Sequence, residues 1–293
     1  MITGARFYRL LLCPFLILYI LLVFIPLLGL IQKSLVKERT VEIELFHPSK
    51  LPSLEWTFKN YGTLLFHSYY RKSTLNTLIV ASIAVLLVII FGTPIAYLLA
   101  RPGMAGKRIL EWIFSLPMFL SGVVACYALF IVMSRQGLLT ILASSLLGKP
   151  VRLTRTFSAI IIGTVYIILP MFIRTVHPGF KRINPELCEA SYSLGASEFY
   201  TFLKIVLPLA LPSLVAGTIL SFTYVMGLVV VALILGPTPV QFSILPLEVL
   251  EKARGLDLNI PLASAMGAVL LVIALAGQAI AEKILRHFYG GVQ

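Results

Sequence analysis

The chain has 293 residues, of which 59% are hydrophobic and only 12% are charged. An ordinary soluble protein has roughly 25% charged residues, so this composition excludes a soluble globular domain and indicates a membrane protein. The formal net charge is +12, but the 24 basic residues are spread through the loops and form no dense block. We therefore read them as charges flanking membrane segments and expect no nucleic-acid partner.

The predicted elements are six membrane helices. A sixth uncharged stretch, 205–247, is too long for one span, and GPTP at 236–239 cannot continue a helix, so we predict a span over about 206–235. The other five stretches lack Asp, Glu, Lys and Arg and are long enough to cross about 30 Å of hydrocarbon: 10–32, 73–100, 112–134, 156–173 and 258–281. The fold class is thus an all-α membrane protein with both termini on one side.

The first stretch could be mistaken for a signal peptide. Its apolar run exceeds the usual length and no small-x-small cleavage site follows, so we predict a membrane helix. We divide the chain into 1–72, the first span with an external loop segment, and 73–285, a core of five spans. Counts of Lys and Arg on the two sides are similar and do not decide the orientation.

Residues 184–208 interrupt the apolar chain with polar, partly acidic sequence, NPELCEASYSLGASEFYTFLKIVLP. Asn184 is a good helix N-cap, and Pro185 is tolerated at the first helical position. Gly195 stands where a helix C-terminal cap is expected, and Ser197 can cap a second helix that runs into the next span. The sequence predicts a helix-turn-helix elbow on the membrane surface, and these features alone favour a simple connector and a docking element equally.

The spacing within the elbow resembles the EAA signature of permease subunits in ATP-binding-cassette importers, E-A-A-x3-G-x9-I-x-L-P. The one departure is Ser191 in place of the second alanine, a small residue for a small residue. The matched positions are Glu189, Ala190, Ser191, Gly195, Ile205, Leu207 and Pro208. NTL at 76–78, PIAYLLAR at 94–101 and the segment 190–217 are similar to the branch of type I importers that handles polyamines, opines, phosphonates and small oxyanions.

This resemblance implies a six-helix permease with cytoplasmic termini in a bacterial or archaeal inner membrane. The elbow would be a coupling helix seated on a cytoplasmic ATPase, and the seven matched residues would form the coupling site. The implied partners are two ATPase subunits, a second permease subunit that is the same or a related chain, and a solute-binding protein. The loops 135–155 and 236–257 would then carry charged docking surfaces for that binding protein. The expected solute is a polyamine, a phosphonate or a small oxyanion.

Other chemistry has little support in the sequence. No G-x-x-x-x-G-K-[ST] loop occurs, so we expect this chain not to be an enzyme and ATP to be hydrolysed in separate subunits. The scattered Cys and His residues predict neither a metal site nor a cofactor. Hydroxyl groups inside the spans could line a path for a polar solute. Those available are Thr93, Ser121, Tyr127, Tyr166, Ser221, Thr223 and Tyr224, and the candidates chosen from them are Tyr127, Tyr166, Thr223 and Tyr224.

Two alternatives stay open at this point. One is a secondary carrier or channel, against which the absence of charged residues within the predicted spans weighs, because proton relays and ion pumps usually need them. The other is a membrane assembly subunit whose elbow recruits a cytoplasmic partner without any transport. Solute flux after reconstitution with an ATPase would separate both from an importer permease.

Overall fold

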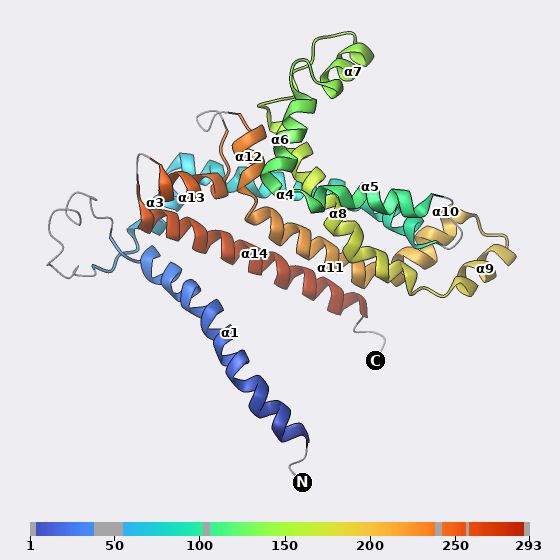
Figure 1. Cartoon of the computed structure of the whole chain (residues 1–293), viewed down its shortest axis with the longest axis horizontal. Coiled ribbons are helices and arrows are strands. Elements are labelled where there is room, and N and C mark those ends of the chain that lie inside the picture. The colour runs from blue at the N-terminus through green and yellow to red at the C-terminus, as the bar shows by residue number, and fades with distance from the viewer. Residues whose placement is uncertain (1–3, 38–54, 102–105, 238–241, 256–257, 290–293) are drawn as a thin grey trace. The chain divides into compact units, whose positions relative to one another are not determined.

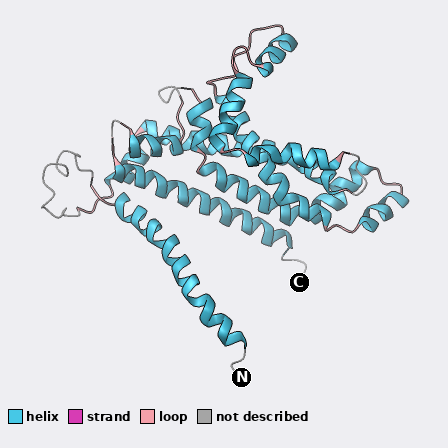
Figure 2. Cartoon of the chain, viewed as in Figure 1, coloured by secondary structure: helices cyan, strands magenta, loops and turns pink. Residues whose placement is uncertain are grey.

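The computed structural model describes residues 4–37, 55–101, 106–237, 242–255 and 258–289, with side chains from 14 to 283 within these ranges. Regular structure in the described ranges is helical throughout (Figures 1 and 2). Six segments are long and apolar enough to cross a membrane, which confirms the predicted number of spans. They are Pro14–Ser34, Ser68–Ala100, Gly122–Leu147, Phe157–Lys181, Glu198–Met226 and Ile260–Lys283.

The chain divides into two compact units, and the first comprises Met1–Arg71 and Glu248–Val269. It contains α1 (Gly4–Ser34) and α3 (Lys59–Phe66) and includes parts of α13 (Leu245–Arg254) and α14 (Ile260–Tyr289). After α1 the chain makes an antiparallel bridge between Val36 and Trp56. The buried amide of Asn60 donates to the carbonyl oxygens of Ser34 at 2.8 Å and Val36 at 2.9 Å, so one side chain satisfies the backbone at the end of α1.

One expected surface charge in this unit is not on the surface. Glu248 was predicted to belong to a charged docking loop over 236–257, but it lies in α13 and is only 4% exposed. The Tyr69 hydroxyl donates to Glu248 Oε1 at 2.6 Å. A carboxylate group that is shielded from water needs hydrogen-bond donors, and the Tyr69 hydroxyl is such a donor. Asp257, from the same predicted loop, lies outside the described residues.

The second unit comprises Lys72–Leu247 and Leu270–Gln293, and its core surrounds Phe172 in α8 (Phe157–Lys181). Most of α4 (Ser68–Ala100) and α11 (Leu207–Met226) pack on this helix. A Cβ atom on Gly92 of α4 would lie 2.7 Å from a Phe172 ring carbon, and one on Gly217 of α11 would lie 2.7 Å from Val176. Two glycines therefore let both helices approach α8 closely, as small residues do between membrane helices.

The predicted helix over 112–134 is wrong as a continuous element. The structure has α5 (Lys107–Phe119) and α6 (Gly122–Met133), separated by Leu120 in an extended conformation. Ser121 begins α6 as an N-cap whose Oγ accepts from Val124 N at 3.4 Å, so a polar capping residue followed by glycine restarts the helix. The predicted loop 135–155 likewise contains a helix, α7 (Leu138–Leu147).

The predicted span over 206–235 is too long. Helix α11 ends at Met226, and α12 (Val229–Leu235) follows after a turn at Gly227. Glycine is a weak helix former, and Gly227 is the residue that caps the end of α11. Helix α12 ends at Leu235, next to the Gly236 that the sequence marked as a break.

Candidate functional site at the helical elbow

The elbow begins with α9 (Pro185–Ser193), which starts as the sequence predicts. Asn184 Oδ1 accepts from the backbone N–H of Glu186 at 3.1 Å, and Pro185 occupies the first turn. Negative charge at Glu186 lies at the positive end of the helix dipole. In Figure 1, α9 and α10 (Glu198–Thr201) lie together at one end of the long helices α8 and α11.

A Schellman turn ends α9 and sets the bend of the elbow. The N–H of Gly195 donates to Tyr192 O at 2.9 Å, and the N–H of Ala196 donates to Ser191 O at 3.1 Å. This pair of bonds requires a left-handed residue between them, and Gly195 has φ +84°. The predicted glycine cap is confirmed. A Cβ atom on Gly195 would meet nothing within 4 Å, so the constraint comes from the backbone and not from crowding within this chain.

The second arm of the elbow leads into the membrane through an irregular helix. Ser197 caps α10, with its Oγ accepting from Tyr200 N at 3.2 Å, as predicted. A π-helical segment, η1 (Phe202–Val206), then precedes α11, and the N–H of Leu207 donates to Phe202 O. Pro208 has no N–H to donate and its ring would crowd the carbonyl four residues earlier, and the wider π turn relieves that conflict.

A buried hydroxyl pair holds the two arms of the elbow together. Ser191 in α9 and Thr201 in α10 are both buried, and their hydroxyl oxygens are 2.9 Å apart. Thr201 donates its proton to Ser197 O at 3.0 Å, so Ser191 is the donor within the pair. The residue that departs from the EAA signature thus contributes a contact that alanine could not make.

The outer face of the elbow is apolar and acidic. Helical spacing puts Leu187, Cys188, Ser191 and Leu194 on one side of α9, but the structure buries Ser191, half-buries Cys188 and exposes the two leucines. Leu194 is 88% exposed and Phe199 is 72% exposed. Among the other signature positions, Glu189, Ala190 and Pro208 are exposed, and Ile205 and Leu207 are half-buried.

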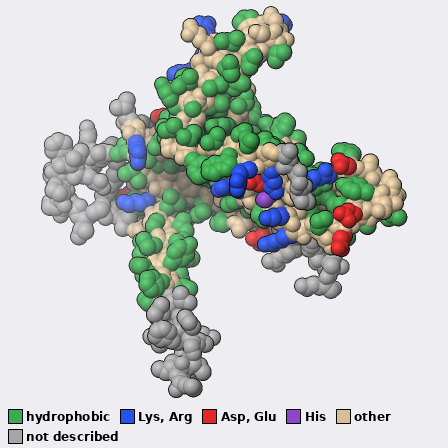
Figure 3. All heavy atoms as spheres, turned by 45° about the vertical axis from the view of Figure 1, so that its right-hand side comes forward, with side chains coloured by type: hydrophobic (Ala, Val, Ile, Leu, Met, Phe, Trp, Pro, Cys, Tyr) green, Lys and Arg blue, Asp and Glu red, His purple; other side chains and the backbone are tan. Residues whose placement is uncertain are grey.

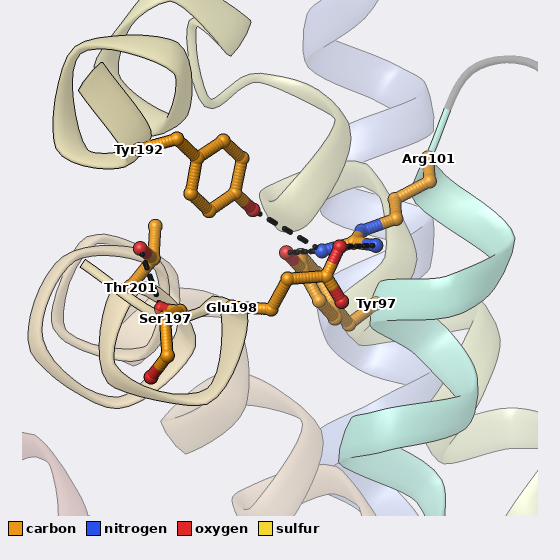
Figure 4. Close-up of polar contacts among 6 residues, drawn as sticks. All are labelled: Tyr97, Arg101, Tyr192, Ser197, Glu198 and Thr201. Atoms are coloured by element: carbon orange, nitrogen blue, oxygen red, sulfur yellow. Dashed lines mark hydrogen bonds and ion pairs between the residues drawn. The ribbon is translucent and has the colours of Figure 1, made fainter. Parts of the chain in front are cut away.

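A guanidinium group joins α4 to both arms of the elbow (Figure 4). Arg101, the residue after α4, donates to the Tyr97 hydroxyl at 2.7 Å, with its guanidinium carbon 4.7 Å from the centre of the Tyr97 ring. It also donates to the Tyr192 hydroxyl in α9 at 3.5 Å and pairs with Glu198 Oε1 in α10 at 3.4 Å. The hydrogen bond to Tyr97 raises the pKa of Arg101, so the group stays charged throughout the usable pH range.

A cavity of about 300 Å³ lies at this junction. Its charged lining residues are Arg101, Lys181, Glu189 and Glu198. Partial burial raises the pKa of the Tyr192 phenol, which also lines the cavity and remains a neutral hydroxyl at neutral pH. The elbow therefore meets the end of α4 in two ways: by these polar contacts beside an open space, and by the ring of Phe202, whose centroid is 4.8 Å from that of Tyr97.

Basic side chains gather next to the acidic elbow (Figure 3). The sequence shows them spread along the chain, but the fold brings those from the ends of α4, α5 and α8 and from η1 to the same end of the second unit. They are Arg101, Lys107, Arg108, Arg174, Lys181, Arg182 and Lys204. Acidic residues also lie at this end: Glu111 lines a cavity with Arg174, and Glu189 and Glu198 line one with Arg101 and Lys181.

The four hydroxyl residues proposed to line a solute path are not joined to one another. Tyr127, Thr223 and Tyr224 are exposed and Tyr166 is half-buried, and within the described part of the chain no hydrogen bond or ring contact links any two of them. Two other hydroxyl groups, of Thr93 and Ser221, are buried with no hydrogen-bond partner in the described structure. A buried polar group without a partner costs about 1–3 kcal/mol, so these two hydroxyl groups stand out among those of the described spans.

Comparisons with known proteins agree on one family. Residues 89–288 match the model described as binding-protein-dependent transport system inner membrane component. The chain is 29% identical over 276 residues to the spermidine/putrescine transport system permease protein PotB of Escherichia coli (strain K12), covering 90% of this chain and 96% of that protein. It is 33% identical over 200 residues to the probable sulfate transport system permease protein cysT of Nephroselmis olivacea, covering 68% and 69% of the two chains.

Solved structures share the fold at low sequence identity. A chain of a bacterial alginate ABC transporter, crystallised in complex with an alginate pentasaccharide-bound periplasmic protein, gives a TM-score of 0.76 at 16% identity and covers 98% of this chain and 96% of its own. A chain of the MetNI methionine ABC transporter in an inward-facing conformation gives 0.57 at 18% identity, covering 76% and 98%.

Proposed function

Because this chain belongs to the family of binding-protein-dependent transport system inner membrane components, it is a permease subunit of an ATP-driven importer, and we propose that its elbow docks on the ATPase. The observation that carries this proposal is the conformation of the signature segment. Its glycine forms a left-handed Schellman turn between two capped helices. Such a turn presents a rigid projection at the end of two membrane helices. A mere connector would not need that rigidity.

The exposed side chains of the elbow suit a protein partner. Leu187, Leu194 and Phe199 are exposed at the end of the molecule that also carries the charged side chains. Full burial of a leucine or phenylalanine stabilises a contact by about 1.5–3 kcal/mol, so burying these three side chains would contribute several kcal/mol to the binding of a partner. Glu186 and Glu189 add charge that can select the partner's orientation. We assign the coupling role to Glu189, Ala190, Ser191, Gly195, Ile205, Leu207 and Pro208.

The protein is a multi-pass inner-membrane component, and the elbow is proposed to face the cytoplasm. The match of the elbow to the EAA signature supports this orientation, whereas Lys and Arg counts on the two sides are similar and do not decide it. With six spans, both termini then lie in the cytoplasm as well. Residues 73–285 form the core of the pore in this proposal, and 1–72 add one span and an external segment.

The proposed mechanism is a rigid-body one. Helix α8 leads into the elbow through Arg182 and Ile183, and α11 leaves it through η1. Closure of two ATPases on ATP would displace the elbow of this chain and that of a second permease subunit, and the attached helices would tilt to open the pore to the other side. ATP hydrolysis then resides in the separate subunits, and a binding protein delivers the solute from outside.

A polyamine is the first choice of solute, because the relative named for spermidine and putrescine aligns over 90% of this chain. A small oxyanion is the second choice, because the relative named for sulfate is more identical over its shorter alignment. The path through the membrane is proposed to include Tyr127, Tyr166, Thr223 and Tyr224, and the buried Thr93 and Ser221 join them. Binding of labelled spermidine, phosphonate and sulfate to the cognate binding protein tests this choice, and tight binding of a sugar or an amino acid would overturn it.

Co-purification with the cognate ATPase tests the docking role. Gly195→Asp adds a side chain and a charge at a left-handed position, and Glu189→Lys reverses a charge on the exposed face. We expect both variants to reach the membrane and to lose the ATPase. Arg135→Gln, in the turn before α7, is the control and should retain it. Full retention of the ATPase by both elbow variants would show that the elbow is only a connector.

A further inference from the structure

Arg101 occupies the place where a span with no direct chain connection to the elbow meets it. Helices α8 and α11 continue into the elbow through the backbone, so any displacement of the elbow reaches them directly. Helix α4 ends at Ala100 and leads to α5 instead. The side chain of Arg101 bridges that gap by contacting Tyr192 in α9 and Glu198 in α10.

The α4 side of this link is anchored in the helical core. Tyr97, which holds the guanidinium by a hydrogen bond and by its ring face, lies between two aromatic neighbours. Its ring centroid is 5.6 Å from that of Phe180 in α8 and 4.8 Å from that of Phe202 in η1. Arg101 is therefore fixed on the α4 side by several contacts, and the contacts to the elbow are the longer and weaker ones.

The elbow side of the link is exposed to solvent. The Arg101–Glu198 ion pair is 3.4 Å long and the Glu198 side chain is 74% exposed, so the pair contributes little to stability. A cavity of about 300 Å³ adjoins the pair, so apolar packing is incomplete at this point. The contacts of Arg101 with Tyr192 and Glu198 are therefore the ones that join α9 and α10 to the end of α4 here.

We propose that Arg101 is a positioning residue that makes α4 follow the elbow when the ATPases close. The inference rests on the proposed docking of the elbow and adds a specific route by which motion reaches a third helix. Arg101 acts through Tyr192 and Glu198 and touches neither nucleotide nor solute. Without it the elbow still docks and still moves α8 and α11, but α4 lags behind and the pore responds poorly to the binding protein.

The first test is ATP hydrolysis by the complete importer in lipid nanodiscs, with and without its cognate binding protein. Removing the charge in Arg101→Gln should lower the ratio of stimulated to basal hydrolysis by about threefold, the effect that corresponds to an exposed ion pair of somewhat under 1 kcal/mol. The charge-swapped pair Arg101→Glu with Glu198→Arg should restore at least half of the ratio. Arg108→Gln removes an exposed arginine that forms no ion pair with a described residue, and it should behave as the unmodified protein.

The second test measures the coupled motion itself. The native cysteines are replaced by alanine, and spin labels are attached at Leu98→Cys in α4 and Ser193→Cys in α9. Pulsed electron paramagnetic resonance then measures the distance between the two labels. Between the nucleotide-free and the vanadate-trapped states the separation should stay within about 2 Å when Arg101 is present, because the two elements move together. In Arg101→Gln it should shift by more than that or become broad.

The outcomes separate this inference from the proposed docking. An Arg101→Gln complex with an unchanged stimulation ratio and an unchanged label separation overturns the role of Arg101. Loss of the ATPase itself from Arg101→Gln also overturns it, because Arg101 would then belong to the docking surface. Gly195→Asp and Glu189→Lys, prepared in parallel, report on docking alone, and retention of the ATPase by both would contradict the proposed function whatever Arg101 does.

Discussion

The elbow and the core around Phe172 belong to one compact unit but are held together by different forces. The core rests on close apolar packing, with Gly92 and Gly217 admitting two helices to the surface of α8. The elbow packs Cys188 and Phe202 against this core, but its bend rests on caps, a left-handed turn, one hydroxyl pair and one guanidinium. A tightly packed core tolerates little change in volume, whereas local polar contacts can be remade. The difference separates a part that must keep its shape from a part that can transmit a displacement.

Overpacking the core should cause the largest loss of stability among these predictions. It should leave the caps and the turn of the elbow unchanged. Gly217→Leu places atoms where even a Cβ would lie 2.7 Å from Val176 and 3.1 Å from Phe172. We expect a loss of about 3 kcal/mol or more in the free energy of unfolding, which lowers the melting temperature by roughly 6–10 °C. Thermal unfolding in detergent, followed by size-exclusion chromatography, measures this shift.

Gly122→Ala is the matched control for that substitution, because a Cβ on Gly122 would meet nothing within 4 Å. Its melting temperature should stay close to that of the unmodified chain. If Gly217→Leu melted at the same temperature as this control, the close approach of α11 to α8 could not be what holds the core, and the contrast with the elbow would fail.

Substitutions at Gly195 should have an intermediate effect that appears in docking and not in unfolding. Alanine at φ +84° costs about 1 kcal/mol, so the exposed turn of the free Gly195→Ala chain leaves the left-handed conformation, and reforming it on docking lowers the affinity for the ATPase about fivefold. Asparagine tolerates the left-handed conformation better, so Gly195→Asn should bind within about twofold of the unmodified protein. Titration of the detergent-solubilised chain with purified ATPase compares the two.

Gly195→Asn is a more discriminating test than Gly195→Ala of why the position is glycine. If Gly195→Asn bound as poorly as Gly195→Ala, the backbone conformation would not be the reason for glycine. The reason would then be a close approach of the partner to the Cα atom, and the elbow would resemble the core in needing space more than conformation.

The sequence predicts the local features of the elbow and misses its tertiary ones, for a physical reason. Asn184, Ser197 and Gly195 act on backbone groups within three residues of themselves, so their roles can be read from spacing. The contact between Arg101 and Glu198 joins positions 97 residues apart and depends on how three helices pack. No periodicity or cap signal could indicate it.

The same reasoning explains the span predictions. Six uncharged stretches gave the right number of membrane helices, because length and the absence of charge set that number. The interruptions at Leu120 and Gly227 were missed, because a composition window does not register a single capping serine or a single capping glycine. The proposed solute path was the least predictable, since hydroxyl groups alone do not show which helix faces meet.

Loss of a single hydroxyl group inside the elbow, in Ser191→Ala, should give the smallest effect, and comparison with its partner Thr201 is the most informative. Ser191→Ala restores the residue of the family signature and removes one hydrogen bond, while Thr201 keeps its bond to Ser197 O, so we expect a loss of about 0.5–1.5 kcal/mol. Thr201→Val should cost more, about 1–3 kcal/mol, because it leaves the Ser191 hydroxyl buried without its acceptor. The double variant should then be no less stable than Thr201→Val alone, since the stranded donor is gone. Ser193→Ala, an exposed serine in the same helix, is the control for hydroxyl loss. Equal melting temperatures for Ser191→Ala, Thr201→Val and this control would mean that the pair does not hold the arms together, and the guanidinium of Arg101 would be left as the main polar link across the elbow.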